Sequence, residues 1–190
     1  MQIGLYFGSF NPVHIGHLII AQYALQHIAV QQIWWVVSPQ NPHKPVQSLL
    51  NEYQRLHLVN LAVQDNHQFK VVDVEFTLPK PSYTVHTLVY LQEKYPQHQF
   101  SILMGADSYT NLPKWKNWEV IIKNHPLLVY ARPGIELPPA YTGSQTHWLQ
   151  APLLDISATY IRQQVKAGKS IQYLVTPAVQ HEIENNRYYQ

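Results

Sequence analysis

The sequence contains no cysteine among its 190 residues, which excludes disulfides, iron–sulfur clusters and thiol nucleophiles. Its 13 basic and 11 acidic side chains leave a formal net charge of +2. That charge is too weak to favour DNA or RNA as a partner, although a local basic cluster would suit a phosphorylated small molecule. No apolar run approaches the length of a membrane span, and the N-terminus lacks a basic region typical of signal peptides. We therefore expect a cytoplasmic protein with no membrane or nucleic-acid partner.

Hydrophobic residues make up 46% of the chain, enough for a full core, and the length suits one domain over residues 1–190. Short continuous apolar runs, typical of buried parallel strands, alternate with longer segments typical of helices. This alternation predicts an α/β fold, namely a doubly wound, Rossmann-like parallel sheet of five to six strands with helices on both faces. The oligomeric state stays open, and a homo-oligomer is compatible with the sequence.

The expected strands cover residues 3–7, 32–37, 69–74, 99–104, 126–130 and 146–149. The expected helices run from about 14 to 25, 51 to 64, 82 or 84 to 94, 157 or 159 to 168, and 176 or 177 to 185. The helix boundaries follow from capping residues such as Asn51 and from the glycine at position 168. We expect Trp34, Trp35 and Trp148 to pack in the core or in an interface.

A glycine turn joins the first strand to the first helix in residues 7–17. Gly8 would let backbone N–H groups approach an anion, and a helix starting near His14 would direct its unpaired amides to the same point. His14 and His17 are three residues apart, so they share a helix face and can both reach that anion. A simple turn is the alternative, and a zinc site is a weaker one because the zincin pattern is incomplete. The segment thus predicts a phosphate site and no metal ligands.

Two further polar candidates follow strands of the predicted sheet. Lys44 lies in the loop after the second strand, at the edge where open α/β sheets bind ligands, but a solvated loop lysine is the default explanation. Gly105 and Asp107 end the fourth strand at the same edge. Asp107 could orient a ribose hydroxyl or a metal-bound water, or it could cap the turn over residues 107–112.

Trp115 and Trp118 stand beside two lysines, a combination that suits stacking of a flat, electron-poor ring near a phosphate. Packing in the core or in an interface is the alternative. Arg162 lies close to the start of a predicted helix, where its charge opposes the helix dipole. That local cost makes sense if an anion lies between the helix and the guanidinium, and a surface salt bridge is the alternative.

The two ends of the chain carry a resemblance to a known family. His14–His17, behind residues 8–12, resembles the first signature of the HxGH nucleotidyltransferase superfamily, and Ile156–Arg162 resembles its second, Ile-Ser-x-Thr-x-x-Arg. The likeness to nicotinate mononucleotide adenylyltransferases extends over residues 41–44, 80–84, 105–107, 112–115 and 131–134. It implies the superfamily's fold and an enzyme of NAD biosynthesis that joins ATP to nicotinate mononucleotide, with release of pyrophosphate.

The resemblance also implies which residues form the site. His14, His17, Arg162 and Lys44 would be catalytic, and Mg²⁺ would accompany ATP. The residues implied to contact ATP are Gly8, Ser9, Phe10, His14, His17, Gly105, Asp107, Ile156, Ser157, Thr159 and Arg162. Those implied to contact the mononucleotide are Lys44, Tyr83, Thr84, Trp115, Trp118 and Arg132.

Three positions depart from the family pattern. Phe7 replaces the first of two glycines, Asn11 replaces an aspartate, and Ala158 replaces a serine of the second signature. Asn11 keeps an acceptor oxygen without the charge, so it has no role that needs a carboxylate. The alternative functions are pantetheine-phosphate adenylyltransferase, a nucleotide-binding sensor, and a metal hydrolase that uses some of the 11 histidines.

Overall fold

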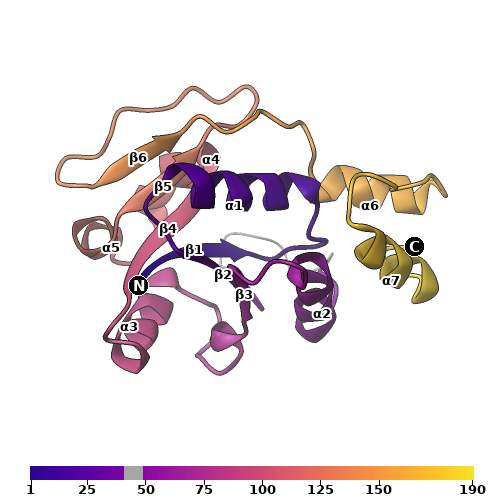
Figure 1. The fold of residues 1–190 in the computed structure, drawn as a ribbon, viewed down its shortest axis with the longest axis horizontal. Coiled ribbons are helices and arrows are strands. Elements are labelled where there is room, and N and C mark those ends of the chain that lie inside the picture. The colour runs from indigo at the N-terminus through magenta and orange to yellow at the C-terminus, as the bar shows by residue number, and fades with distance from the viewer. Residues whose placement is uncertain (41–48) are drawn as a thin grey trace.

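A computed structural model describes residues 1–40 and 49–190, and its centre is a six-stranded parallel sheet (Figure 1). The strand order is β3-β2-β1-β4-β5-β6. The strands are β1 (Gln2–Gly8), β2 (Gln32–Val37), β3 (Phe69–Val72), β4 (Gln99–Gly105), β5 (Leu127–Tyr130) and β6 (Thr146–Leu149). The chain steps outward from β1 to β3 and then crosses back to β4, so the doubly wound sheet predicted from the sequence is confirmed.

Helices cover both faces of this sheet. The helices are α1 (Ile15–His27), α2 (Glu52–Val63), α3 (Thr84–Lys94), α4 (Ala106–Thr110), α5 (Trp118–Asn124), α6 (Ala158–Lys166) and α7 (Pro177–Asn185). Buried side chains of α1, α2, α6 and α7 share one apolar cluster, and those of α3, α4 and α5 share the other. Figure 1 shows α1 and α3 on opposite sides of the central strands.

Strand alternation divides the core between these two clusters. In β1, Leu5 packs on the α3 side and Tyr6 on the α1 side. In β2, Trp34 and Trp35 divide in the same way, and at 2% and 0% exposure both are core residues, as predicted. Trp148 is half-buried against Tyr109, with ring centroids 5.1 Å apart.

Several boundaries differ from those expected. β3 ends at Val72 because a short 3₁₀ turn, η2 (Val74–Phe76), takes over. The N-cap of α3 is Tyr83 rather than Ser82 or Thr84. The segment expected as a turn holds α4 and a second 3₁₀ turn, η3 (Leu112–Lys114).

Helix α5 was not predicted at all. It has seven residues and follows Asn117, whose left-handed backbone (φ 53°) turns the chain into the helix without a side-chain cap. Asparagine tolerates this conformation better than most residues, but a single asparagine in a sequence does not predict a left-handed backbone.

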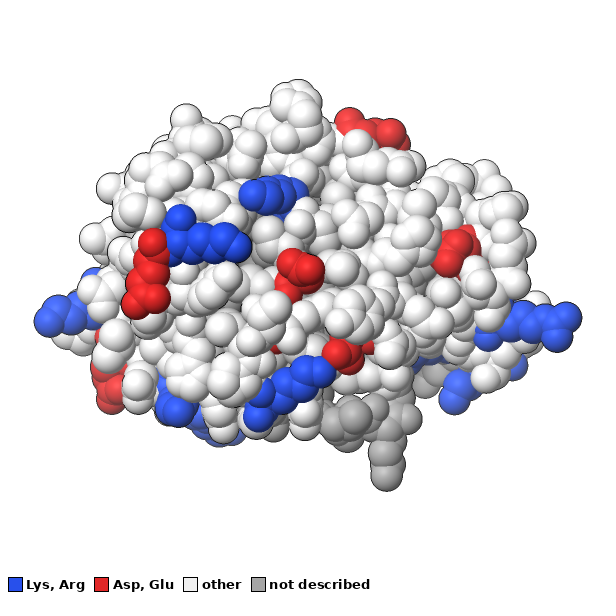
Figure 2. All heavy atoms as spheres, turned by 90° about the horizontal axis from the view of Figure 1, so that it is seen from below, with Lys and Arg blue, Asp and Glu red and all other residues white. Residues whose placement is uncertain are grey.

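The order reversal between β1 and β4 places their carboxyl ends side by side, which is where open α/β sheets bind ligands. In the described ranges no helix is long and apolar enough to cross a membrane. On the face drawn in Figure 2, basic and acidic side chains are interspersed over a largely uncharged surface. That face carries no stripe of one charge that could follow a nucleic-acid backbone.

Candidate active site

A cavity of about 480 Å³ opens at the carboxyl ends of β1 and β4, and it is lined from both ends of the chain. The N-terminal part contributes residues 6–11 together with His14 and His17. The C-terminal part contributes residues 157–159 and Arg162, from the start of α6. The two sequence signatures, which are about 140 residues apart, therefore meet around one space.

The two histidines of the first signature lie together at the start of α1. His14 is the N-cap residue, and its ring centroid lies 3.7 Å from that of His17. The backbone N–H of His14 donates to Nδ1 of His17 at 3.2 Å, so a neutral His17 carries its ring proton on Nε2. A Cβ on Gly16 would lie 3.1 Å from Nδ1 of His14. The glycine between the histidines thus makes room for the His14 ring.

His14 is held as a neutral ring. His14 is 7% exposed, and the backbone N–H of His17 faces its side chain in a capping box, but the buried Nδ1 makes no well-formed hydrogen bond in the described chain. Burial, and secondarily the nearby positive charge of Arg132, lower the pKa of His14 to about 4. A buried polar atom without a partner on the wall of a cavity is suited to a ligand atom.

Arg162 is fixed by contacts within both signatures. Its Nη1 donates to the carbonyl oxygen of Asn11 at 2.8 Å, and its Nη2 donates to Oγ1 of Thr159 at 3.3 Å. Ser157 caps α6 by accepting a hydrogen bond from the backbone of Tyr160 at 3.1 Å. A guanidinium has five N–H donors, so these two bonds leave donors for an anion in the cavity.

In the turn after β1, the glycine at position 8 and the amides at the start of α1 have contacts beyond the predicted approach to an anion. A Cβ on Gly8 would lie 2.8 Å from the ring of Phe10, so the glycine is needed for ring packing. The N–H of Ile15 donates to the carbonyl oxygen of Leu174, and that of His17 to the carbonyl oxygen of His14, both at 2.9 Å. The start of α1 therefore offers an anion fewer backbone amides than a bare helix end, and the histidine side chains carry more of that role.

The opposite wall of the cavity comes from the start of α3 and from residues after η3. Ser82, Tyr83 and Thr84 line it together with Trp115 and Lys116. Lys116 Nζ lies 4.9 Å from the centroid of the Tyr83 ring, within cation–π distance. This wall combines aromatic rings with a positive charge, a combination that suits stacking of a flat ring near a phosphate.

Trp118 is not part of this wall. It is half-buried, its ring packs against that of Tyr141 with centroids 5.2 Å apart, and it lines neither this cavity nor the one beside it. The structure thus brings Trp115 to the cavity but leaves Trp118 in apolar packing.

A second cavity of about 240 Å³ adjoins the first, and both are lined by His14, His17, Asp107, Arg132 and Ser157. Ile156 lines only this second space. Arg132 Nε lies 3.2 Å from Oδ1 of Asp107, so the ion pair stands where the two spaces meet. The adjoining cavities could hold two parts of one large ligand.

The cavity also contains a residue that no sequence pattern indicated. Glu75, in η2, lines the first cavity although it is only 1% exposed. Its Oε1 accepts from Thr87 at 2.9 Å, and its Oε2 is buried without a hydrogen-bond partner in the described ranges. Burial raises the pKa of Glu75, and the nearby hydroxyls of Ser38, Thr87 and Ser82 oppose that rise. An acidic residue in an Asp-Val-Glu run looks solvent-exposed from sequence, and no pattern in the sequence indicates that Glu75 is buried.

Lys44 lies outside the described residues, so its predicted contact stays a prediction. Within the described ranges, no group of three or more His, Asp or Glu side chains could hold a metal ion. A Mg²⁺ ion that arrives with ATP needs no such group, because it keeps several waters and binds through phosphates. Asp107 lies on the wall of both cavities, and its carboxylate pairs with Arg132.

Comparisons with known proteins agree with this geometry. The cytidylyltransferase-like family model matches residues 5–164. A protein of Flavobacterium psychrophilum named a probable nicotinate-nucleotide adenylyltransferase is 47% identical over 191 residues, which cover 100% of this chain and 99% of the relative. One of Cytophaga hutchinsonii with the same name is 48% identical over 189 residues, covering 100% of this chain and 98% of the relative.

Solved structures share the fold. Nicotinic acid mononucleotide adenylyltransferase of Plasmodium falciparum, complexed with NaAD, superposes with a TM-score of 0.83 at 17% identity, covering 99% of this chain and 97% of that one. A putative nicotinate-nucleotide adenylyltransferase from Vibrio parahaemolyticus gives 0.73 at 20% identity, with 99% and 94% covered. These likenesses confirm the Rossmann-like fold. On the full-length similarity to its relatives, the chain belongs to the nicotinate-nucleotide adenylyltransferase family of nucleotidyltransferases.

Proposed function

We propose that this chain transfers the adenylyl group of ATP to nicotinate mononucleotide, giving nicotinate adenine dinucleotide and pyrophosphate in NAD biosynthesis. Membership of the family supports the reaction. The observation that carries it at the level of residues is the meeting of His14, His17 and Arg162 around one cavity whose far wall is aromatic.

The reaction requires that the two substrates be held in position, and it does not require a nucleophilic side chain. A 5′-phosphate oxygen of the mononucleotide attacks the α-phosphorus of ATP, and the bond from that phosphorus to the bridging oxygen breaks. Pyrophosphate leaves with the bonding electrons. The attacking phosphate is already ionised at pH 7, so neither a base nor a covalent intermediate is needed. Catalysis then comes from orientation and from donors directed at the developing charge.

The donors at the triphosphate come from both signatures. His14 and His17 hold oxygens of the α- and β-phosphates, and Arg162 holds those of the β- and γ-phosphates. Because burial lowers the pKa of His14 to about 4, its ring is neutral before ATP binds, and Arg162 supplies a permanent positive charge for the triphosphate. Lys44 is proposed for the incoming phosphate on the family resemblance alone.

The mononucleotide ring occupies the wall formed by Tyr83, Thr84 and Trp115. Arg132 stays in the proposed substrate contacts, because it lies where the two cavities meet. Trp118 is left out, since it packs against Tyr141.

Nucleotidyltransferases of this family carry out a metal-dependent reaction, and we propose Mg²⁺ as the metal. Bound to the triphosphate, it would neutralise charge on the departing pyrophosphate. Asp107 would hold one of its waters. A cytoplasmic location remains a prediction, and the oligomeric state stays open.

The test is to mix the protein with ATP, Mg²⁺ and, in separate reactions, nicotinate mononucleotide, nicotinamide mononucleotide, phosphopantetheine or no acceptor, and to measure pyrophosphate. We expect release that depends on the nicotinate substrate. Binding of ATP without turnover would indicate a sensor, product release without a mononucleotide would indicate a hydrolase, and turnover only with phosphopantetheine would indicate the other adenylyltransferase. Each of these three results contradicts the proposal.

A further inference from the structure

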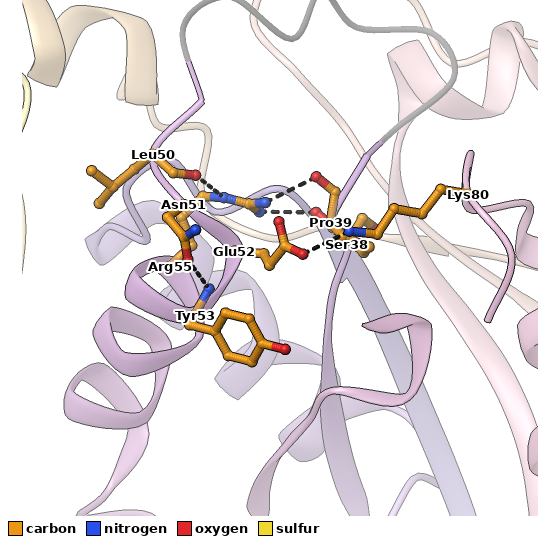
Figure 3. Close-up of polar contacts among 8 residues, drawn as sticks. All are labelled: Ser38, Pro39, Leu50, Asn51, Glu52, Tyr53, Arg55 and Lys80. Atoms are coloured by element: carbon orange, nitrogen blue, oxygen red, sulfur yellow. Dashed lines mark hydrogen bonds and ion pairs between the residues drawn. The ribbon is translucent and has the colours of Figure 1, made fainter. Parts of the chain in front are cut away.

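A buried arginine behind the cavity has no part in the reaction as described so far. Arg55 lies in the first turn of α2 and is only 1% exposed. All its hydrogen bonds in the described chain go to backbone carbonyl oxygens, as Figure 3 shows for three of them. Nε donates to Leu50 at 2.8 Å, Nη1 to Ser9 at 2.6 Å and Ser38 at 2.9 Å, and Nη2 to Pro39 at 3.1 Å.

The charge of Arg55 has no carboxylate partner among the described residues. The nearest acidic neighbour along α2, Glu52, instead pairs with Lys80 at 2.7 Å (Figure 3). Burial lowers the pKa of Arg55, yet a guanidinium keeps its proton at neutral pH. Burying an unpaired charge is costly, and an apolar residue would pack α2 against the sheet at lower cost. Packing alone therefore does not explain why an arginine occupies position 55.

Two of the four carbonyls belong to residues that line the cavity. Ser9 follows β1, Ser38 follows β2, and both residues line the cavity. Because a carbonyl oxygen is an acceptor, each one drawn to Arg55 is an acceptor kept away from bound phosphates. In a planar trans peptide the N–H points opposite to the C=O, so the Ser9 contact also turns the N–H of Phe10 away from Arg55.

The Ser9 contact also reaches the histidines through Phe10. Phe10 has a left-handed backbone (φ 44°), a conformation that a bulky residue keeps only when its surroundings enforce it. The Phe10 ring packs edge-on against His17, with centroids 5.2 Å apart. A fixed Ser9 carbonyl thus fixes Phe10, and Phe10 fixes one side of the His17 ring.

We propose that Arg55 is a positioning residue, which holds the Ser9–Phe10 turn so that acceptors face away from the triphosphate and His17 keeps its orientation. This inference rests on the proposed function for its kinetic readout, because the triphosphate is the ligand of that reaction. Arg55 acts through Ser9 and Phe10, and it does not touch the reacting atoms.

The test compares Arg55→Met, Arg55→Lys and Arg55→Ala with Leu58→Ala. Leu58 lies on the same helix and is 0% exposed, but it does not line the cavity, so its truncation lowers stability without disturbing the turn. At a temperature where all variants are folded by circular dichroism, we expect Arg55→Met to lower kcat about 10²-fold, because a displacement of about 1 Å in catalytic groups can cost that much. Arg55→Lys should retain more activity, Leu58→Ala should keep the wild-type kcat, and guanidinium at low millimolar concentration should partly rescue Arg55→Ala.

A second readout does not depend on turnover. The ring signals of His17 in a ¹H–¹³C NMR spectrum, assigned with His17→Gln, should shift in Arg55→Met and not in Leu58→Ala. If the wild-type protein makes no pyrophosphate, the proposed function fails, while the NMR comparison still decides the role of Arg55. Unchanged His17 signals in Arg55→Met, or an equal loss of kcat in Arg55→Met and Leu58→Ala, would overturn the inference.

Discussion

Arg162, in the first turns of α6, donates a hydrogen bond to the backbone carbonyl oxygen of Asn11, which lies 2.8 Å away and 151 residues earlier in the chain. This bond ties the second signature to the turn that precedes the first. The contact is independent of the side chain at position 11, because the backbone carbonyl makes it. The Asn11 side chain has its own partner, since Oδ1 accepts from the N–H of Leu50 at 3.1 Å.

Replacing Arg162 with alanine removes the positive charge proposed for the β- and γ-phosphates. We expect kcat/KM for ATP to fall about 10²–10³-fold, because a charged donor to the transition state is lost. Thr159→Val, which removes only the hydroxyl partner of Nη2, should cost far less. Steady-state kinetics at saturating nicotinate mononucleotide measure both, and equal losses in the two variants would argue against a direct role for the guanidinium.

His17→Ala should lower turnover much more than it weakens ATP binding. The donor is proposed to act on charge that grows during the reaction, so kcat should fall about 10²–10³-fold while the dissociation constant for ATP changes little. Single-turnover kinetics and calorimetric titration separate the two quantities. A near-normal kcat in this variant would refute the assignment.

The buried His14 should make the fold sensitive to mild acid. Its pKa is about 4 in the folded state against about 6.5 when unfolded, so below pH 6.5 protons bind the unfolded chain preferentially. The contribution is present above pH 6.5 and is lost as pH falls towards 4, amounting to about 2 kcal/mol between pH 7 and 5. Denaturant unfolding of wild type and His14→Gln at both pH values measures it. The same dependence in both proteins would show that His14 is not its source.

Glu75 should act in the opposite direction. Its pKa is raised in the folded state, so its stabilising contribution is present below pH 4.5 and is lost as pH rises through the folded value. Glu75→Gln keeps an acceptor for Thr87 without a charge to bury. We expect this variant to raise Tm at pH 8 by about 3 °C, or about 1 kcal/mol for a chain of this size, and to change it little at pH 4.5. A lower Tm at pH 8 would contradict the argument.

The two tryptophans provide a matched pair. Trp115 lines the cavity whereas Trp118 packs against Tyr141, so Trp115→Ala should raise KM for the mononucleotide about tenfold and Trp118→Ala should leave it unchanged. Thermal unfolding of both variants shows whether packing is lost. Equal changes in KM would mean that the aromatic wall is assigned to the wrong ring.

Much of the fold was predictable because apolar periodicity reports burial directly. The strands of the central sheet and the caps Asn51 and Ser157 are local signals, and the structure contains them. Helix α5 escaped because its seven residues hold too few turns for periodicity to show, and its entry depends on a left-handed Asn117. A helix can be predicted from sequence when it is long enough to show apolar periodicity or when it has a recognisable capping residue.

The sequence predicted site residues only where they belong to a recognisable motif. His14, His17 and Arg162 stand in patterned segments, and the structure brings those segments together around one cavity. Arg55 and Glu75 were missed because charged side chains are expected at the surface, and their burial depends on partners far away in sequence. Backbone carbonyls that accept from an arginine leave no trace in the residue types.

A crystal structure of this protein with a non-hydrolysable ATP analogue tests the central claim most directly. The account predicts that the His17 ring and the Arg162 guanidinium each lie about 3 Å from phosphate oxygens of a single triphosphate. A triphosphate held by only one of the two signatures, or bound outside the shared cavity, would contradict it.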